Sequence, residues 1–257
     1  MINFKQKIQN KLRPAKGDKE AAYLRAQAAI AIGQVIDSGK SLRKILKDNA
    51  NKFPQGSDQS TFKEICFGSI RWYYLLEAIT NQLLNSPLSK KHYDLKYLIC
   101  CGLYQLIHTN IPPHAIVNET VAAARLINKP WACKLVNKIL RQFMRKKDGV
   151  LEQVQSDSWA YYAHPKWLFD LIQADWPEHW QQIINENNQK PPFTLRINRQ
   201  KTSPQGYIAL LNNHKIPAHS DSKFTDAVIV EKPLPATTLP GFSHGLCSVQ
   251  DLAGRKV

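Results

Sequence analysis

The sequence of 257 residues lacks the short motifs by which many enzymes hold nucleotides or metal ions. None of its 11 glycines stands within two positions of another, so no Gly-x-Gly turn is present to cradle a nucleotide or an S-adenosyl group. A complete Gly-x-x-x-x-Gly-Lys-Ser/Thr phosphate loop is missing too, because Gln34 stands where its first glycine would precede Gly39-Lys40-Ser41. The eight histidines form neither a His-x-His nor a His-Glu-x-x-His pattern, which disfavours a metal site. We therefore expect no metal and no cofactor in this chain.

Cysteine pairs and long apolar runs are also scarce. The five cysteines include no Cys-x-x-Cys pair, and most of them lie inside apolar helical patterns, which favours reduced, buried thiols. The first residues carry charges but no apolar core of a signal peptide. The longest apolar stretch, YLICCGLYQLI, is far shorter than the roughly 20 residues of a membrane span. These absences predict a cytoplasmic protein without a membrane partner.

Acidic residues are few compared with basic ones. Lysine and arginine number 35 against 20 aspartates and glutamates, which gives a formal net charge of +15. Such an excess favours a polyanionic partner, with nucleic acid first and an anionic membrane surface second. The alternative of a basic globular protein without a polyanionic partner also remains open.

The apolar residues that are present follow two patterns. Up to about residue 147 they recur at intervals of three and four, which predicts helices separated by short turns. The predicted helices are 19–37, 41–50, 59–85, 91–108, 113–127 and 131–147. Short connections between helices are typical of an all-α bundle. Further helices are expected within 157–189, where Pro165 and Pro177 are placed to open them.

The pattern of apolar and polar residues changes after the helices. Residues 191–198 alternate apolar and polar side chains, which predicts a half-buried strand, and residues 226–232 predict another. A helix is expected at 204–213 between them. The fold class is therefore mainly α, with an all-α bundle followed by a small α+β domain. We expect a basic, flexible segment at 1–18, the bundle at 19–147, and a helical linker plus α+β domain at 148–245.

The predicted helix WACKLVNKILRQFMRKK carries the sharpest signal for function. Its apolar residues cover one broad face, and cations spaced 4, 3 and 4 apart line the opposite side. We call these four cations, Lys134, Lys138, Arg141 and Arg145, the basic stripe. Lys146 and Lys147 extend it, and no acid interrupts the run before Asp148. Contact with RNA phosphates is one interpretation, and a solvated helix face is the other.

Other residues are weaker candidates for a functional site. Arg196 and Arg199 flank the first strand of the second domain, where they either meet an RNA backbone or are plain surface arginines. His114 and His164 are typical of helix starts, and Asp175, Glu178 and His179 of helix ends. Cys247 lies on an apolar patch without a nearby base, which disfavours a nucleophile. The chain is therefore expected to bind rather than to catalyse.

Several longer stretches of the sequence resemble known protein families. The segment from Tyr93 to Arg145, with GLYQL, IPPHAIVNETV and VNKILR, resembles the second half of a NusB-type RNA-binding domain. HPKWLFDLIQADWP, PPFTLRINRQKTS and GLCSVQDLA occur in the same order in the bacterial 16S rRNA cytosine-C5 methyltransferases of the RsmB (Sun/Fmu) type. The resemblance runs from about Ala21 to Ala253.

The resemblance implies more than the residues alone. In that family a NusB-like domain and a small linking domain precede a doubly wound methyltransferase domain, which uses S-adenosylmethionine and catalytic cysteines. None of its motifs occurs in this chain, so no catalytic or cofactor-binding residue is carried over. We expect residues 246–257 to be the truncated start of that domain. The resemblance implies an rRNA methyltransferase whose present part is inactive alone and positions 16S ribosomal RNA.

Two alternatives stay open. A freestanding NusB-like antitermination factor would use the same helical domain, although it would not need residues 157–257. A DNA-binding regulator would explain the charge, although no turn and recognition helix stand out.

Overall fold

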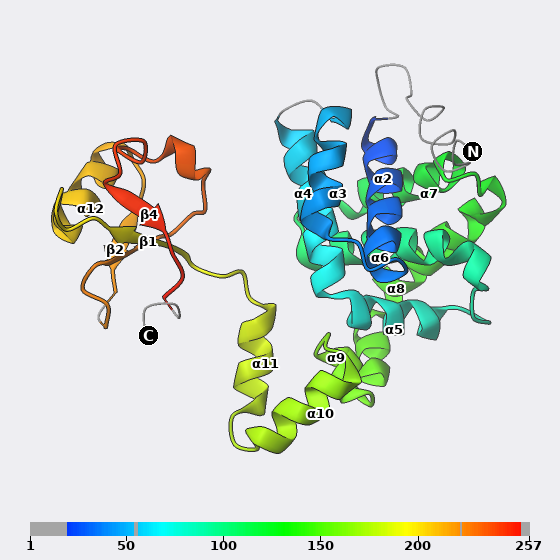
Figure 1. Ribbon diagram of the computed structural model, residues 1–257. Coiled ribbons are helices and arrows are strands. Elements are labelled where there is room, and N and C mark those ends of the chain that lie inside the picture. The colour runs from blue at the N-terminus through cyan, green and yellow to red at the C-terminus, as the bar shows by residue number, and fades with distance from the viewer. Residues whose placement is uncertain (1–19, 54–55, 222, 253–257) are drawn as a thin grey trace. The chain divides into compact units, whose positions relative to one another are not determined.

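The computed structural model describes residues 20–53, 56–221 and 223–252 (Figure 1). The chain divides into two compact units after Asn188. Each unit has its own hydrophobic core, so each is described by itself.

The first unit is helical throughout its described residues, which confirms the predicted all-α bundle. Its α-helices are connected by short turns. They are α2 (Glu20–Ile36), α3 (Leu42–Asn49), α4 (Ser57–Arg71), α5 (Tyr73–Leu83), α6 (Tyr93–His108), α7 (Pro113–Leu126), α8 (Cys133–Gln155), α9 (Ser158–Tyr161), α10 (Lys166–Asp175) and α11 (Trp180–Asn188).

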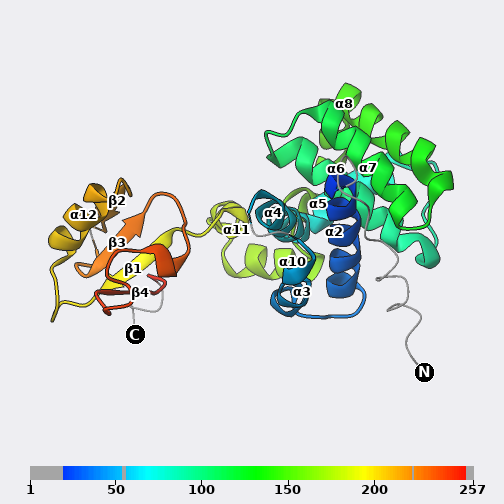
Figure 2. The same cartoon turned by 90° about the horizontal axis from the view of Figure 1, so that it is seen from above.

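Helix α6 forms the centre of the bundle. It contacts α2, α4, α5, α7 and α8, and its residues from Leu95 to Gln105 are buried without interruption (Figure 2). A helix surrounded on all sides is apolar all round, which explains the run YLICCGL without a membrane span. No helix in the described part of the chain has both the length and the hydropathy to cross a bilayer.

The crossing of α4 and α6 depends on one glycine. A Cβ atom at Gly68 would overlap the ring of Tyr104, so the ring packs directly on the α4 backbone. This approach lets the Tyr104 hydroxyl donate to Glu64 Oε1 at 2.7 Å. On its other side, the Tyr104 ring stacks on His108, with ring centroids 5.3 Å apart.

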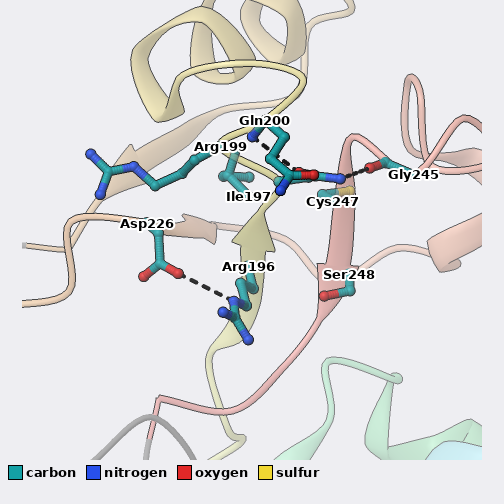
Figure 3. Close-up of a pocket in the computed structure, with 9 residues that line it drawn as sticks. Arg196, Ile197, Arg199, Gln200, Asp226, Gly245, Cys247 and Ser248 are labelled. Atoms are coloured by element: carbon teal, nitrogen blue, oxygen red, sulfur yellow. Dashed lines mark hydrogen bonds and ion pairs between the residues drawn. The ribbon is translucent and has the colours of Figure 1, made fainter.

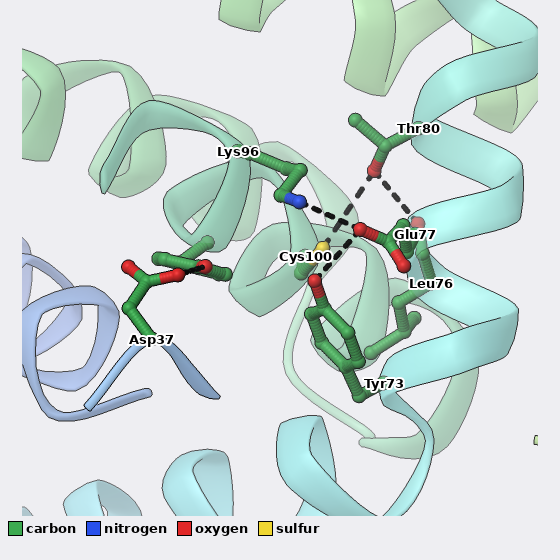
Figure 4. Close-up of polar contacts among 8 residues, drawn as sticks. Asp37, Tyr73, Leu76, Glu77, Thr80, Lys96 and Cys100 are labelled. Carbon is green, nitrogen blue, oxygen red and sulfur yellow. Dashed lines mark hydrogen bonds and ion pairs between the residues drawn. The ribbon is translucent and has the colours of Figure 1, made fainter. Parts of the chain in front are cut away.

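A buried cation joins α5 and α6 (Figure 4). The Lys96 Nζ atom lies 2.6 Å from Glu77 Oε1, and this same oxygen accepts the Tyr73 hydroxyl at 2.7 Å. The Lys96 ammonium lies 4.0 Å from the ring centroid of Tyr93 and is also near the rings of Tyr73 and Tyr97. Ion pairing and cation–π contacts thus offset the desolvation of this lysine.

The second unit is a small antiparallel sheet with one α-helix among its described residues. Its elements are β1 (Phe193–Ile197), α12 (Pro204–Asn213), β2 (Ala218–Ser220), β3 (Ala227–Val230) and β4 (Cys247–Val249), and the strand order is β2-β3-β1-β4. Helix α12 begins where the Ser203 Oγ atom accepts the Gly206 N–H at 3.0 Å. The predicted small α+β fold is confirmed.

Some predicted boundaries differ from the structure. The expected helix 59–85 is interrupted at Trp72, whose ring stacks on His108 with centroids 4.5 Å apart. The helix predicted at 131–147 has a kink at Lys146 and continues, as part of α8, to Gln155. The three-residue strands β2 and β4 were not predicted.

The placement of the domains also differs from the expected division. The contacts divide the chain after Asn188, so α9, α10 and α11 lie in the first unit and not in a separate linker. Residues 247–249 pair with β1, and Leu246 and Cys247 pack in the second core, so this segment completes the sheet. The expected flexible segment 1–18 and residues 253–257 lie outside the described residues.

Candidate nucleic-acid interface

Helix α8 separates its apolar and basic residues cleanly. Val136, Ile139, Leu140 and Phe143 are buried in the first core, and Leu135 is half-buried. All four cations of the basic stripe are exposed, as are Lys146 and Lys147. The helical period predicted from the sequence therefore places the six cations on the solvent side of the helix.

The described residues do not neutralise the basic stripe. In the part of the chain that the structure describes, none of its four cations makes an ion pair. Arg141 is bonded only to a neutral side chain, with its Nε atom donating to Asn137 Oδ1 at 3.0 Å. Adjacent cations therefore repel each other across one helical turn, and an anion from outside the chain would relieve this repulsion.

Lys147, at the end of the basic run, affects the pKa of His108 in the bundle. Burial and, to a lesser extent, the nearby Lys147 ammonium lower the pKa of His108 to about 4. The Glu64 carboxylate opposes this shift only in part. His108 is therefore neutral at physiological pH, between the rings of Trp72 and Tyr104.

In the second unit Arg196 and Arg199 line one polar pocket of about 510 Å³ (Figure 3). Both side chains are exposed. Arg196 Nε lies 3.3 Å from Asp226 Oδ2, an ion pair that the sequence did not predict. Asn198 Nδ2 donates to the Gly245 carbonyl at 3.1 Å and closes one wall of the pocket. Arg196 is thus partly neutralised, unlike the cations of α8.

The thiols have the buried, inert character that the sequence predicted. All five cysteines are free, and Cys66, Cys100, Cys101 and Cys247 are buried. Burial raises the pKa of the Cys247 thiol, and its Sγ atom lies 3.0 Å from the Tyr207 hydroxyl in the second core. Burial likewise raises the pKa of Cys100 to about 12. A thiolate nucleophile is disfavoured at both positions.

The other polar candidates do not gather into a catalytic cluster. The structure's described residues contain no group of three or more histidines, cysteines or acids that could hold a metal ion. His164 is buried with its Nδ1 atom 2.7 Å from the Tyr162 carbonyl, while His114 is exposed at the start of α7. Asp175 ends α10, and Glu178 and His179 lie in the turn before α11. These positions agree with the expected helix ends.

The described residues also do not fit S-adenosylmethionine. Their sheet is antiparallel throughout, and the turn from β1 to α12 contains no glycine. No described strand thus leads through a glycine-rich turn into a helix, which is the feature expected for this cofactor.

One feature near the basic stripe escaped sequence reasoning. The kink at Lys146 borders a pocket lined by residues of α5 and α8, three of which are glutamines. The hint of a local irregularity in the sequence was Gly149, just beyond the predicted helix 131–147, because glycine is a poor helix former.

Two family matches account for most of the chain. Residues 23–145 match the NusB family, and residues 164–237 match the ferredoxin-like domain of RsmF/B-like methyltransferases. The second match agrees with the β1–α12–β2–β3 succession and the strand order of the second unit. The chain therefore contains a NusB domain followed by an RsmF/B-type ferredoxin-like domain.

The curated relatives that match across both domains are named as ribosomal RNA methyltransferases. The chain is 42% identical over 231 residues to the probable ribosomal RNA small subunit methyltransferase B of Coxiella burnetii, and 40% identical over 237 residues to ribosomal RNA small subunit methyltransferase B of Escherichia coli. These alignments cover 90% and 92% of this chain but 52% and 55% of the relatives. The chain thus spans about half the length of the curated relatives it matches.

A solved structure supports the fold. The crystal structure of PH0851 has a TM-score of 0.57 and 14% sequence identity, covering 94% of this chain and 55% of that chain. At this identity the likeness concerns the fold alone.

Proposed function

We propose that this chain is the RNA-binding region of an rRNA cytosine-C5 methyltransferase that uses S-adenosylmethionine, and that it positions 16S ribosomal RNA for methyl transfer elsewhere in the enzyme. The observation that carries the proposal is the exposed basic stripe on α8, within residues that match the NusB family. The relatives named as ribosomal RNA small subunit methyltransferase B supply the reaction and the class of RNA.

The charges support the phosphate backbone as the first point of contact. The basic stripe, Lys146 and Lys147 present six exposed cations along one helix. Phosphate contacts of this kind supply affinity that depends on salt and fix the orientation of an RNA without reading its sequence. The helical part of α8 before the kink holds the basic stripe in register, so the bound RNA is oriented as well as attracted.

The second unit has a smaller part in the proposal. Arg196 and Arg199 offer cations beside a polar pocket, but Asp226 already pairs with Arg196. A phosphate at this pocket would have to compete with that carboxylate, so we assign these arginines a weaker contact than the α8 cations.

The alternative of a freestanding NusB-like antitermination factor is less well supported. Similarity to the methyltransferases continues through the second unit, where residues 164–237 match a domain described for RsmF/B-like methyltransferases. A factor limited to the helical domain leaves that match unexplained.

The experiment that tests the proposal reverses the basic stripe. In the variant Lys134→Glu, Lys138→Glu, Arg141→Glu, Arg145→Glu, affinity for a fragment of 16S ribosomal RNA should fall about a hundredfold at moderate salt. The slope of log affinity against log salt concentration should become shallower by about 3, because about 0.7 ion is released per contact with single-stranded RNA. Fluorescence anisotropy across a salt series measures both quantities.

A matched control keeps the change in net charge constant. The variant Arg43→Glu, Lys44→Glu, Lys47→Glu, Lys63→Glu reverses four exposed cations on α3 and α4. It should change the affinity much less and leave the slope close to that of the parent chain. Equal losses in the two variants would show that only total charge matters, and the α8 interface would be abandoned.

A further inference from the structure

We propose that the pocket at the α8 kink holds one unpaired adenine base of the RNA, read by glutamine amides. The proposal rests on the proposed function, because it assumes that RNA lies along α8. It adds a site for a base to a surface that otherwise contacts only phosphates.

The pocket lies beside the kink of α8. Lys146 has φ −124° and ψ 27°, which departs from helical geometry within α8. The neighbouring pocket has a volume of about 470 Å³ and lies between α5 and α8. Its lining residues are Gln82, Leu83, Gln142, Lys146, Gly149, Val150 and Gln153. This volume lies within the range of about 300–1,000 Å³ that is usual for small-ligand pockets.

The lining suits a flat ring with polar edges. Leu83 and Val150 are buried and give the pocket an apolar part. Glutamine amides both donate and accept hydrogen bonds, and an amide can bond adenine through its N6 and N7 atoms together. No carboxylate lines the pocket, so nothing there repels a nucleotide.

The two facing amides are already oriented. Gln82 Nε2 donates to Gln153 Oε1 at 2.7 Å across the two helices. This bond leaves the Gln82 carbonyl oxygen and the Gln153 amide hydrogens as the acceptor and donors for a ligand. An acceptor and a donor side by side complement the N6 amino group and the N7 atom of adenine.

The charges around the pocket suit the phosphates of the same nucleotide. Lys146 lines the pocket. Its neighbours in sequence, Arg145 and Lys147, are both exposed. A base that leaves the RNA stack brings its flanking phosphates with it, and these need cations at the rim. Sequence-specific recognition of RNA generally uses such unstacked bases, which single strands offer most readily.

The test measures base preference with the full 257-residue chain. Four short RNAs differ only in one unpaired position, which is adenine, cytosine, guanine or uracil. The parent chain should bind the adenine RNA about tenfold more tightly than the others, as expected for one amide pair that reads a base. In Gln82→Met, Gln153→Met this preference should fall below about twofold, while the salt slope stays unchanged. Gln155→Met, an exposed neighbour outside the pocket, should keep the preference.

A second pair of variants fills the pocket instead of changing its polarity. A Cβ atom at Gly149 would meet nothing within 4 Å, so Gly149→Met can extend into the open space and Gly149→Ala adds only a methyl group. The methionine should abolish the preference for adenine, and the alanine should retain it. Thermal melting of each variant shows that the fold is kept.

The outcomes separate this inference from the proposed function. Equal affinity of the parent chain for all four RNAs, preference for another base, or a preference that survives both pocket variants overturns the adenine site. The reversed basic stripe should weaken binding of all four RNAs alike. If that variant weakens binding and no base preference exists, only the pocket fails; if it leaves affinity and slope unchanged, the proposed function fails.

Discussion

Two regions of the first unit hold cations in opposite ways. Lys96 is buried among Glu77 and three tyrosine rings, so every favourable contact of its ammonium lies inside the protein. The basic stripe on α8 is exposed, and no described acid pairs with it. The same charge therefore stabilises the fold in one place and is left for an external partner in the other.

This contrast distinguishes a structural from a binding role without reference to any relative. A buried cation needs compensation by neighbouring groups, or the folded state loses stability. An exposed row of like charges costs little in water but repels itself. Removal of a charge should therefore have opposite effects on stability in the two regions.

The largest effect is expected at the buried pair. Glu77→Gln leaves the Lys96 ammonium without its carboxylate and should lower the free energy of unfolding by about 3 kcal/mol. RNA affinity of the folded protein should not change. Urea denaturation measures the stability, with Glu152→Gln on the exposed side of α8 as the control. The double variant Glu77→Gln, Lys96→Met should recover part of the loss, and a single variant as stable as the parent chain would remove the contrast.

An intermediate effect is expected at His108, whose pKa is lowered by burial and by the nearby Lys147. Its pKa in the folded state is lowered to about 4, mainly by burial, from an ordinary value near 6.5. Because the unfolded chain takes up the proton first, stability is fully present above pH 6.5 and is lost as the pH falls toward 4. The ring is partly exposed, so we expect a loss of about 1 kcal/mol between pH 7 and pH 5.

The variant His108→Phe tests this pH dependence. Phenylalanine keeps the stack with Trp72 and Tyr104 but cannot take up a proton, so the acid loss should shrink. His114→Gln, at an exposed position, should leave the loss unchanged. Denaturation curves at the two pH values supply the measurement, and equal acid losses in both variants would count against the assignment.

The smallest effect is expected on α8 itself. Lys138→Gln removes the repulsion with Lys134 and Arg141, so the free energy of unfolding should rise by about 0.5 kcal/mol at low salt. High salt should erase this gain, because it screens exposed charges. RNA affinity should fall about threefold, as for the loss of one phosphate contact.

A control for this variant lies on α4. Lys63 is exposed, and no charged residue stands three or four positions from it, so Lys63→Gln should not raise the stability. A loss of stability in Lys138→Gln would mean that the stripe has a structural partner after all.

Much of the fold could be predicted because local pattern and tertiary structure agree. Helix α12 has the predicted bounds 204–213, and β1 and β3 lie within the predicted strands. Strands β2 and β4 have three residues each, too few for a recognisable alternation, and β4 pairs with a strand some fifty residues away. The interruption at Trp72 was missed because apolar periodicity continues through it, and the stack of Trp72 on His108 involves a helix distant in sequence.

The candidate site, too, has a part that the sequence predicts and a part that it does not. The exposure of the basic stripe followed from its spacing along one helix. The ion pair of Arg196 with Asp226 joins residues thirty positions apart in sequence, and the pocket at the kink needs α5 beside α8. Contacts of this kind depend on tertiary packing, which a local pattern does not contain.

The close approach at Gly68 has a consequence for how this sequence can change over time. Any side chain at position 68 displaces the ring of Tyr104, and with it the hydroxyl contact to Glu64 and the stack on His108. A larger residue at 68 is therefore tolerated only in company with a smaller one at 104. The two positions therefore constrain each other, although they are 36 residues apart along the chain.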